Sequence, residues 1–317
     1  MQNKNEQPLV SFIVTTCNLP IPMLRECLQS ILTLSLSDEE REIIVIDDGS
    51  EVSPLNDLVE LRDKITYVRQ RNMGLSTARN MGLVCAQGKF IQFIDGDDYL
   101  LQAPYEHCLD IARYREADLI LFHETQQAVT KVPFEYEGPI TGTAYMHQHN
   151  LRASACGYLF RSQILKSLRF TPNRLHEDEE FTPQLLLRAQ HVYFTSSKAY
   201  YYRQRSGSIT NDESMRHAAK RLDDTESIIL RLLDIAQHSP AMERVALNRR
   251  IAQLTMDYLY NTIQLTHSAK HLNEAIDRLH KRGLFPLPDK SYTRKYAAFR
   301  KMVNTSLGRR ILLMMIR

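Results

Sequence analysis

Short apolar runs alternate with amphipathic segments through the first half of this 317-residue chain, and no other feature constrains the fold as strongly. The runs EIIVI and FIQFI are apolar almost without interruption, as is typical of parallel strands buried on both faces. Between such runs, apolar residues recur with a helical period, for example at Leu24, Cys27, Leu28 and Ile31. The pattern predicts an α/β fold in which a mostly parallel sheet is flanked by helices.

The expected elements follow one another closely along this half. Strands are predicted at residues 10–15, 42–46, 65–68, 89–94 and 119–122, and helices at 23–34, 55–61, 76–86 and 105–116. The pattern loosens at residues 132–150, which indicates an excursion or an edge hairpin, and residues 199–202 are a candidate late strand.

After Asn211 the pattern becomes helical almost throughout. Helices are predicted at residues 214–237, 241–267, 272–282 and 296–303. A chain of this length is expected to hold about two domains, at about 100–200 residues each. We therefore expect an α/β domain over residues 1–211 and an all-helical domain with a basic tail over residues 212–317.

Charge and cysteine content exclude several classes of protein. The formal net charge is only +3, which is too balanced for a protein dedicated to coating nucleic acid. The five cysteines are widely spread and form no C-x-x-C pair, which argues against a disulfide framework or a zinc knuckle and indicates a reducing cytoplasm. The first residues lack the apolar core of a signal peptide, and no stretch approaches the roughly 20 apolar residues of a membrane span. We expect a cytoplasmic protein.

Three of the expected strands run into polar clusters, namely TTCN at residues 15–18, DDGS at 47–50 and DGDD at 95–98. Ligands of open parallel sheets bind at this carboxyl edge, where so many acidic residues would repel one another unless a cation or hydrogen-bond donors lay among them. Mg²⁺ and Mn²⁺ are commonly held by one or two carboxylates plus substrate phosphates, so the pattern favours a metal–diphosphate site. Asp and Gly are also ordinary turn formers, and DDGS alone could simply cap a helix. The chain has no P-loop, dinucleotide fingerprint, zinc-protease helix or nucleophile elbow.

Four segments together make a specific resemblance: VSFIVTTCN, EIIVIDDGS, NMGLSTARNMG and FIQFIDGDDYL, in this order and at these spacings. The first 210 residues or so resemble the family 2 glycosyltransferases, which have a Rossmann-like GT-A fold. The resemblance implies an inverting, metal-dependent enzyme that binds a nucleoside-diphosphate sugar, often UDP-linked. Its acceptor would be a hydroxyl of a cell-surface polysaccharide or of a lipid-linked glycan.

The resemblance also implies roles for the first two strand ends. Thr15 and Asn18 match positions that hold the nucleotide, and Asp48 matches the aspartate that reads the base, with Asp47 as a less certain contact. Many relatives place an aromatic residue where this chain has Cys17, so stacking on the base is missing and the identity of the base is in doubt.

Further matches lie around the diphosphate. Arg79 matches an arginine near the nucleotide and diphosphate, Asp95 would contact the ribose, and Asp97 would bind Mn²⁺ or Mg²⁺ with support from Asp98. Farther along, YYYRQRSGSIT resembles a stretch that closes over the diphosphate or the acceptor. Arg205 and Ser208 are its candidate residues, although a plain surface turn would explain them equally well.

A second carboxylate cluster, LHEDEEFTPQ, precedes an expected helix. By the resemblance Asp178 would be the catalytic base, with Glu177 beside it, and a helix N-terminus is expected to favour its ionised form. The simpler alternative is that acidic residues, with Thr182 and Pro183, mark the start of any helix.

The last segment is strongly basic, since residues 290–317 contain eight basic and no acidic residues, and it ends in an apolar run. Such a segment can lie on the anionic inner face of a membrane, or it can pack on its own domain with a solvated basic face. Two other functions remain open at this point. A nucleotidyltransferase would need no acceptor base, and a non-catalytic nucleotide-sugar-binding or scaffold protein would not hydrolyse any sugar nucleotide. A processive synthase is disfavoured because the chain has no Trp for the Q-x-x-R-W motif.

Overall fold

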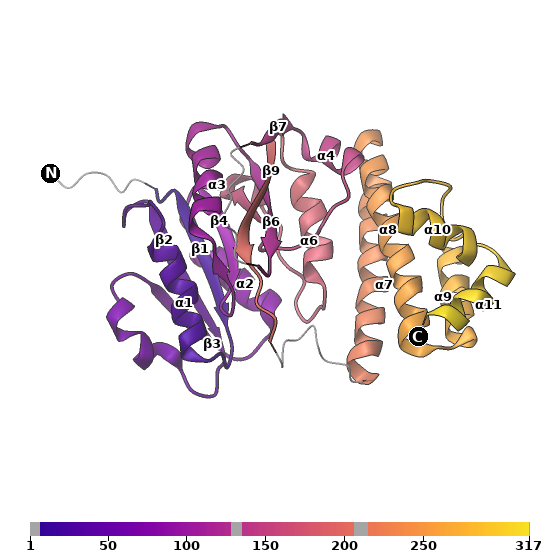
Figure 1. The fold of residues 1–317 in the computed structure, drawn as a ribbon, viewed down its shortest axis with the longest axis horizontal. Helices are drawn as coiled ribbons and strands as arrows, with labels where there is room; N and C mark the ends of the chain where they lie inside the picture. Colours follow the sequence, from indigo (N-terminus) through magenta and orange to yellow (C-terminus); the bar gives the residue numbers. More distant parts are fainter. Residues whose placement is uncertain (1–6, 128–134, 206–214, 317) are drawn as a thin grey trace. The chain divides into compact units, whose positions relative to one another are not determined.

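The computed structural model of the chain describes residues 7–127, 135–205 and 215–316 (Figure 1). Contacts divide the chain into two compact units, Met1–Tyr145 with Ala153–Ser208, and Met146–Arg152 with Ile209–Arg317. The expected boundary at residue 211 lies outside the described residues. The second unit also takes in residues 146–152, which the sequence pattern assigns to the first domain.

The first unit is built on a nine-stranded sheet. Its strands are β1 (Val10–Thr16), β2 (Arg41–Asp48), β3 (Thr66–Gln70), β4 (Phe90–Asp95), β5 (Tyr99–Leu100), β6 (Leu119–Thr125), β7 (Glu137–Ile140), β8 (Tyr158–Arg161) and β9 (Val192–Tyr201). The helices are α1 (Ile21–Leu32), the 3₁₀-helix η1 (Pro54–Leu61), α2 (Leu75–Cys85), α3 (Gln102–Tyr114), α5 (Ser162–Leu165) and α6 (Glu177–Leu186). A further helix, α4 (Gly142–Gln148), contains residues of both units.

The strand order is β3-β2-β1-β4-β8-β6-β9-β5, and β7 pairs with β9 (Figure 1). The strands β3, β2, β1 and β4 are mutually parallel, as are β6 and β9. The pairings of β8 with β4 and β6, and of β9 with β5 and β7, are antiparallel. The expected α/β class is therefore confirmed, and its parallel half carries the acidic strand ends.

Strand β1 lies at the centre of the parallel half and is buried along its whole length. This explains why its sequence is apolar on both faces, since helices cover such strands from both sides. On one side α2 comes very close, because a Cβ on Gly82 would lie 2.2 Å from Cγ2 of Ile13. The absence of a side chain at Gly82 thus lets α2 pack directly on β1 and sets the position of the helix that carries Arg79.

Several elements differ from the expectation. Strand β9 begins at Val192, seven residues before the expected strand, and β8 was not expected. The expected helix at residues 55–61 is a 3₁₀-helix. Of the loose segment 132–150, residues 132–134 lie outside the described ranges, and the remainder forms β7, which pairs with β9, followed by α4.

The second unit is helical, as expected. It contains α7 (Met215–His238), α8 (Ala241–Thr266), α9 (Ala269–Lys281), α10 (Arg294–Val303) and α11 (Ser306–Met315), of which α11 was not expected. Glu226 on α7 accepts hydrogen bonds from the Tyr258 hydroxyl of α8, at 2.7 Å, and from Arg278 of α9, at 2.9 Å. This charged cluster ties three helices together. Among the described helices, none is long and apolar enough to cross a membrane.

Candidate active site

The polar ends of β1, β2 and β4 meet at one edge of the sheet. In the parallel register Thr16 on β1 is paired with Asp47 on β2, and Thr15 is paired with Asp95 on β4. The Thr15 hydroxyl donates to Oδ1 of Asp95 at 3.3 Å. The structure therefore brings the three expected clusters together at the edge where α/β sheets bind ligands.

Asp47 and Asp48, at the end of β2, are both buried and hydrogen-bonded. Asp47 Oδ1 accepts from the backbone N–H of Ser50 at 2.9 Å, and its Oδ2 accepts from the Tyr67 hydroxyl at 2.7 Å. Arg69 lies 3.4 Å from the same Oδ2. Asp47 thus holds the turn after β2 and the neighbouring strand β3.

Asp48 organises the loop that leads into α2. Its Oδ1 accepts from Nε2 of Gln70, at 2.7 Å, and from the backbone N–H of Met73, at 2.9 Å. Its Oδ2 accepts from the backbone N–H of Gly74 at 2.8 Å. Both oxygens have protein partners, so Asp48 shapes this loop, and its role in reading the base remains a prediction.

The loop after β1 is tied to the loop after β2. Asn18 has a left-handed backbone conformation, with φ of 49°, and its side-chain oxygen accepts from the N–H of Glu51 at 2.8 Å. Its own N–H donates to the Ser50 hydroxyl at 2.9 Å. Beside it, burial and then the charges of Asp48 and Asp47 raise the pKa of the Cys17 thiol. Cys17 is therefore a neutral thiol at the position where the resemblance implies an aromatic ring.

The three aspartates that follow β4 have different environments. Asp98 is buried, and it accepts from the Tyr200 hydroxyl at 2.7 Å and from the backbone N–H of Arg203 at 2.8 Å. Burial, followed by repulsion from Asp95, raises the pKa of Asp98 to about 8. Asp98 therefore fastens the end of β9 to the β4 loop, and its expected support of metal binding by Asp97 remains a prediction.

Asp95 and Asp97 are the more accessible carboxylates, with side chains 31% and 18% exposed. Asp97 Oδ2 lies 2.5 Å from Nε of Arg205, a residue that the sequence analysis singled out. Ser208, its companion in that analysis, lies outside the described residues. The ion pair brings a guanidinium from beyond β9 to the carboxylate expected to bind metal, and such a group is suited to pairing with phosphate.

These two carboxylates are suited to a Mg²⁺ or Mn²⁺ ion that takes only one or two of its ligands from the protein. Within the described ranges, no group of three or more His, Cys, Asp or Glu side chains is arranged to hold a metal. The hard oxygens of Asp97 and Asp95 instead match an ion that takes one or two protein carboxylates and completes its shell with substrate phosphates and water. The donor set is thus compatible with the expected metal.

Arg79, on α2, is buried beneath this edge and bridges two carboxylates. One terminal nitrogen lies 2.9 Å from Oδ1 of Asp95 and the other lies 2.5 Å from Oε1 of Glu177 on α6. The guanidinium also faces the ring of Phe170 at 5.6 Å. Burial favours its neutral form, but the charges of Asp95 and its other acidic neighbours raise the pKa of Arg79 well above its usual value. The expected nucleotide contact of Arg79 remains a prediction, and the observed contacts give it a positioning role.

The first turn of α6 contains four acidic residues, Glu177 to Glu180. Glu177 pairs with Arg79, and Glu180 pairs with Arg174. Asp178, between them in sequence, is only partly exposed. Glu177 and Glu180 are therefore engaged in ion pairs, and Asp178 forms no such pair among the described residues.

The surroundings of Asp178 oppose the effect of the helix N-terminus. A helix N-terminus favours a carboxylate, so the sequence predicts that Asp178 is ionised near neutral pH. Burial and then repulsion from Glu177 and Glu179 raise the pKa of Asp178 well above its usual value, and Arg79 offsets this only in part. The ionised form of Asp178 at neutral pH therefore remains a prediction. A raised pKa lies closer to neutral pH, and a general base is most effective when its pKa is near the pH at which the enzyme works.

Some contributors to the site were missed by the sequence analysis. Tyr67, Tyr200 and Arg203 all hold the strand-end aspartates in place. Tyr200 and Arg203 lie in the YYYRQRSGSIT stretch, which the sequence analysis singled out for Arg205 and Ser208. The sequence therefore indicated this segment but not these two residues. Tyr67 gave none, because a tyrosine on a half-buried strand is ordinary.

Comparison with known proteins finds similarity to glycosyltransferases. A sequence model described as glycosyl transferase family 2 matches residues 11–158, which include β1, β2, β4 and their acidic ends. The uncharacterized glycosyltransferase EpsJ of Bacillus subtilis is 31% identical over 222 residues, which are 64% of this chain and 63% of EpsJ. The chain therefore spans less than two thirds of the length of this relative.

Two solved structures resemble the chain over most of its length. S. aureus TarS 1–349, in complex with UDP-GlcNAc, has a TM-score of 0.62 at 19% identity, over 93% of this chain and 90% of TarS 1–349. The mannosyltransferase PcManGT from Pyrobaculum calidifontis, in complex with GDP-Man and Mn²⁺, has a TM-score of 0.57 at 13% identity, over 98% of this chain and 88% of that protein. At these identities the similarity establishes a shared fold.

Proposed function

We propose that this chain, whose residues 11–158 match the model described as glycosyl transferase family 2, is an inverting, metal-dependent glycosyltransferase. Its donor is a nucleoside-diphosphate sugar, and we propose a UDP-linked one because the solved TarS structure holds UDP-GlcNAc. Its acceptor is a hydroxyl of a cell-surface polysaccharide or of a lipid-linked glycan. The five free cysteines suit a reducing compartment, so we place the reaction in the cytoplasm.

The observation that carries this proposal is the double ion pair of Arg79. One guanidinium holds Asp95, at the strand-end edge, and Glu177, the residue next to Asp178. Because both partners contact the same side chain, the edge where the donor would lie and the candidate base are close together. A nucleotide-binding site alone would not require this connection between β4 and α6.

The residues of this chain can be assigned to the steps of one displacement. Asp178, as a carboxylate, takes the proton of the acceptor hydroxyl while that oxygen attacks the anomeric carbon. The new C–O bond forms as the bond to the diphosphate breaks, and the nucleoside diphosphate leaves from the opposite face. Arg79 fixes α6 relative to β4 and favours the ionised form of Asp178 through its positive charge.

The donor would be bound at the strand ends. Thr15, Asn18 and Asp48 are proposed to surround the nucleoside, and Asp95 to bind the ribose. Asp97, and Asp95 if both carboxylates contribute, would hold Mg²⁺ or Mn²⁺ next to the diphosphate. When bound, this cation neutralises the negative charge that develops on the leaving diphosphate.

Release of nucleoside diphosphate, measured with a panel of UDP- and GDP-linked sugars, tests the proposal. We expect one or more donors to be hydrolysed slowly in water, with Mn²⁺ or Mg²⁺ required and chelation abolishing the signal. Asp178→Asn should remove sugar transfer, whereas a nucleotidyltransferase would keep its activity in this variant. If no sugar nucleotide is hydrolysed or transferred under any metal condition, the proposal is wrong and a non-catalytic binding protein is favoured.

A further inference from the structure

The last helix of the second unit, α11, presents apolar side chains to solvent. Leu307, Met314 and Met315 are 68%, 68% and 71% exposed, although large apolar residues are usually buried. They occur on a helix of only ten residues. A soluble helix normally turns its polar face outward, so α11 needs an explanation that packing within the unit does not provide.

The orientation of α11 is fixed by its contacts with α10. A Cβ on Gly308 would lie 2.1 Å from the backbone oxygen of Met302, so the two helices approach at backbone distance there. Arg309 donates to the carbonyl of Val303 at 2.9 Å, and Leu312 is buried. With Gly308 and Leu312 facing inward, Leu307 and Met314 lie on the opposite side of the helix.

Exposed basic residues lie on the same two helices, α10 and α11. Lys301 on α10 and Arg310 on α11 are exposed, as are Arg294 and Lys295. The chain contains no acidic residue from position 290 onward. We refer to Leu307, Met314 and Met315 together with Lys301 and Arg310 as the α10–α11 surface.

We propose that the α10–α11 surface binds the surface of an anionic lipid bilayer. Exposed apolar side chains, together with basic residues that outnumber the acidic residue nearest to them in sequence, Asp289 paired with Arg300, are complementary to acyl chains beneath negatively charged headgroups. The helix is too short to span a bilayer and would lie in the interface, with the methionines and the leucine inserted. Flexible methionine side chains can adapt to an irregular partner surface such as the acyl-chain boundary.

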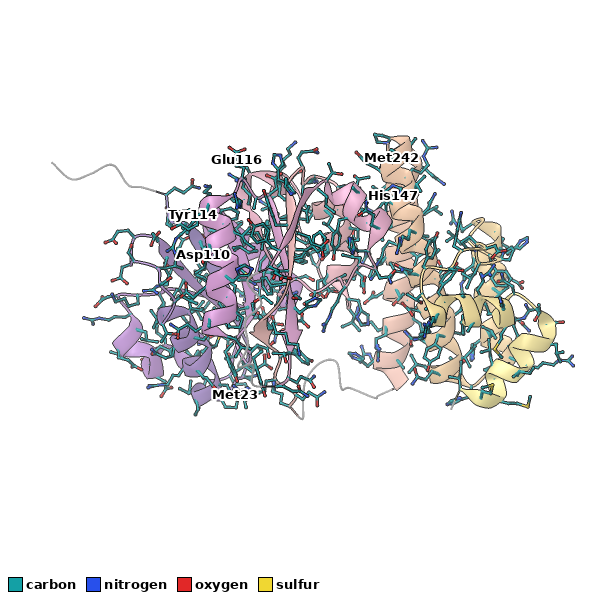
Figure 2. The ribbon with its side chains drawn as sticks, turned by 45° about the horizontal axis from the view of Figure 1, so that its top comes forward. Met23, Asp110, Tyr114, Glu116, His147 and Met242 are labelled. Carbon is teal, nitrogen blue, oxygen red and sulfur yellow. The ribbon has the colours of Figure 1, made fainter. Side chains whose placement is uncertain are left out.

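A second exposed apolar pair in the same unit provides an internal control. Met242 and Val245 on α8 are 65% and 54% exposed, and the Met242 carbonyl lies 2.9 Å from Nε2 of His147 (Figure 2). Their helix carries Glu243 in its first turn, so this pair lacks the predominantly basic surroundings of α11. Removing Met242 and Val245 therefore deletes exposed apolar surface without altering the α10–α11 surface.

The experiment measures co-sedimentation of the full chain with vesicles. Wild-type protein should bind vesicles of phosphatidylcholine with phosphatidylglycerol, and should bind much less to phosphatidylcholine alone or at high salt. The double variant K301Q/R310Q should lose about 25-fold in partitioning, since each basic residue contributes about fivefold. The triple variant L307S/M314S/M315S should lose more than about tenfold. All five positions are exposed, so the folded state should survive, which circular dichroism verifies.

The control M242S/V245S should bind like the wild type. The proposal is overturned if wild-type protein does not bind anionic vesicles, if both α11 variants bind as well as wild type, or if the control loses as much as they do. It is also overturned if light scattering shows a dimer that the triple variant dissociates while vesicle binding is absent, because a second copy would then cover the surface.

A lipid-linked acceptor would explain why such a surface exists, and that connection rests on the proposed function. The vesicle measurement itself uses no sugar donor, metal or acceptor. Failure of glycosyl transfer and failure of membrane binding are therefore separate results. If membrane binding holds and the acceptor is lipid-linked, the triple variant should turn over a water-soluble acceptor fragment at the wild-type rate and lose activity only on the acceptor embedded in vesicles.

Discussion

Two pairs of aspartates lie at the carboxyl ends of two parallel strands and have different surroundings. Asp47 and Asp48 are the last two residues of β2, are buried, and accept hydrogen bonds from the surrounding loops. Asp95 ends β4 and Asp97 lies two residues beyond it; both are more exposed, and they pair with Arg79 and Arg205. The hydrogen bonds of the DDGS aspartates agree with the turn-forming interpretation of that segment. In the DGDD segment, Asp95 and Asp97 remain accessible to a ligand.

Substitutions that remove a charge without changing side-chain shape test this comparison. The largest effect is expected at Asp178, the candidate base near the β4 carboxylates. Asp178→Asn should reduce turnover about 100- to 10,000-fold, the usual contribution of a general base. The stability of Asp178→Asn at neutral pH should equal or exceed that of the wild type. The pKa of Asp178 is higher in the folded state than in the unfolded chain, so its carboxyl destabilises the fold at any pH above its unfolded-state pKa.

Turnover and thermal denaturation of this variant would be compared with those of Asp110→Asn. Asp110 is an exposed residue of α3 (Figure 2), and its substitution makes the same chemical change away from the site. Equal turnover by the two variants would remove Asp178 from the mechanism.

Asp97→Asn should reduce turnover about 100-fold or more, since the cation contributes several kcal/mol to charge stabilisation. Its effect on unfolding should be below about 1 kcal/mol, as is usual for a partly exposed ion pair. Metal titration of turnover tests the first part, and urea denaturation tests the second. If Asp97→Asn is strongly destabilised, Asp97 has a structural role like that of Asp47 and Asp48, and the proposed difference between the two pairs is wrong.

Asp48→Ala should instead destabilise the fold by about 1–3 kcal/mol, because the N–H groups of Met73 and Gly74 lose their acceptors. Urea unfolding, compared with Asp110→Ala, measures this cost. A change of less than about 0.5 kcal/mol, typical of surface substitutions, would show that the loop does not depend on Asp48.

The smallest expected effect concerns pH. Asp178 must be ionised to act, so turnover falls as pH falls through its pKa. Glu179→Gln removes one of the charges that raise this pKa and should move the acidic limb of the pH–rate profile to lower pH, by about 0.5–1 unit. A profile that stays in place, or moves to higher pH, would contradict the assignment of that limb to Asp178.

The parallel half of the fold could be predicted from sequence because its strands are buried on both faces. β1, β2 and β4 appear as apolar runs with polar residues at their ends, and both features are local. β8 was missed because it has only four residues. It is held in the sheet by pairing with β4 and β6, which are distant in sequence, so a local pattern does not predict it. α11 was missed because it packs on α10 through Gly308, a poor helix former, and because Leu307, Met314 and Met315 are exposed, so no apolar stripe marks its buried face.

For the site, sequence predicts which charges lie at element ends but not which charges pair. Arg79 and Glu177 are 98 positions apart, and their ion pair depends on how α2 and α6 pack. The raised pKa of Asp178 has the same origin, because burial and neighbouring carboxylates are properties of the folded chain. The expectation of a helix-stabilised carboxylate considered only the helix itself.

The central claim is that the carboxylates after β4 bind a divalent cation together with the diphosphate of a donor. Thermal denaturation with UDP, in the presence and absence of Mn²⁺, tests this most directly, since stabilisation follows affinity. We predict that Mn²⁺ increases the stabilisation by UDP in the wild type and in Asp178→Asn, and that Asp97→Asn loses this increase. If no nucleoside diphosphate stabilises the wild type with either metal, or if Asp97→Asn responds to Mn²⁺ as the wild type does, the claim is wrong.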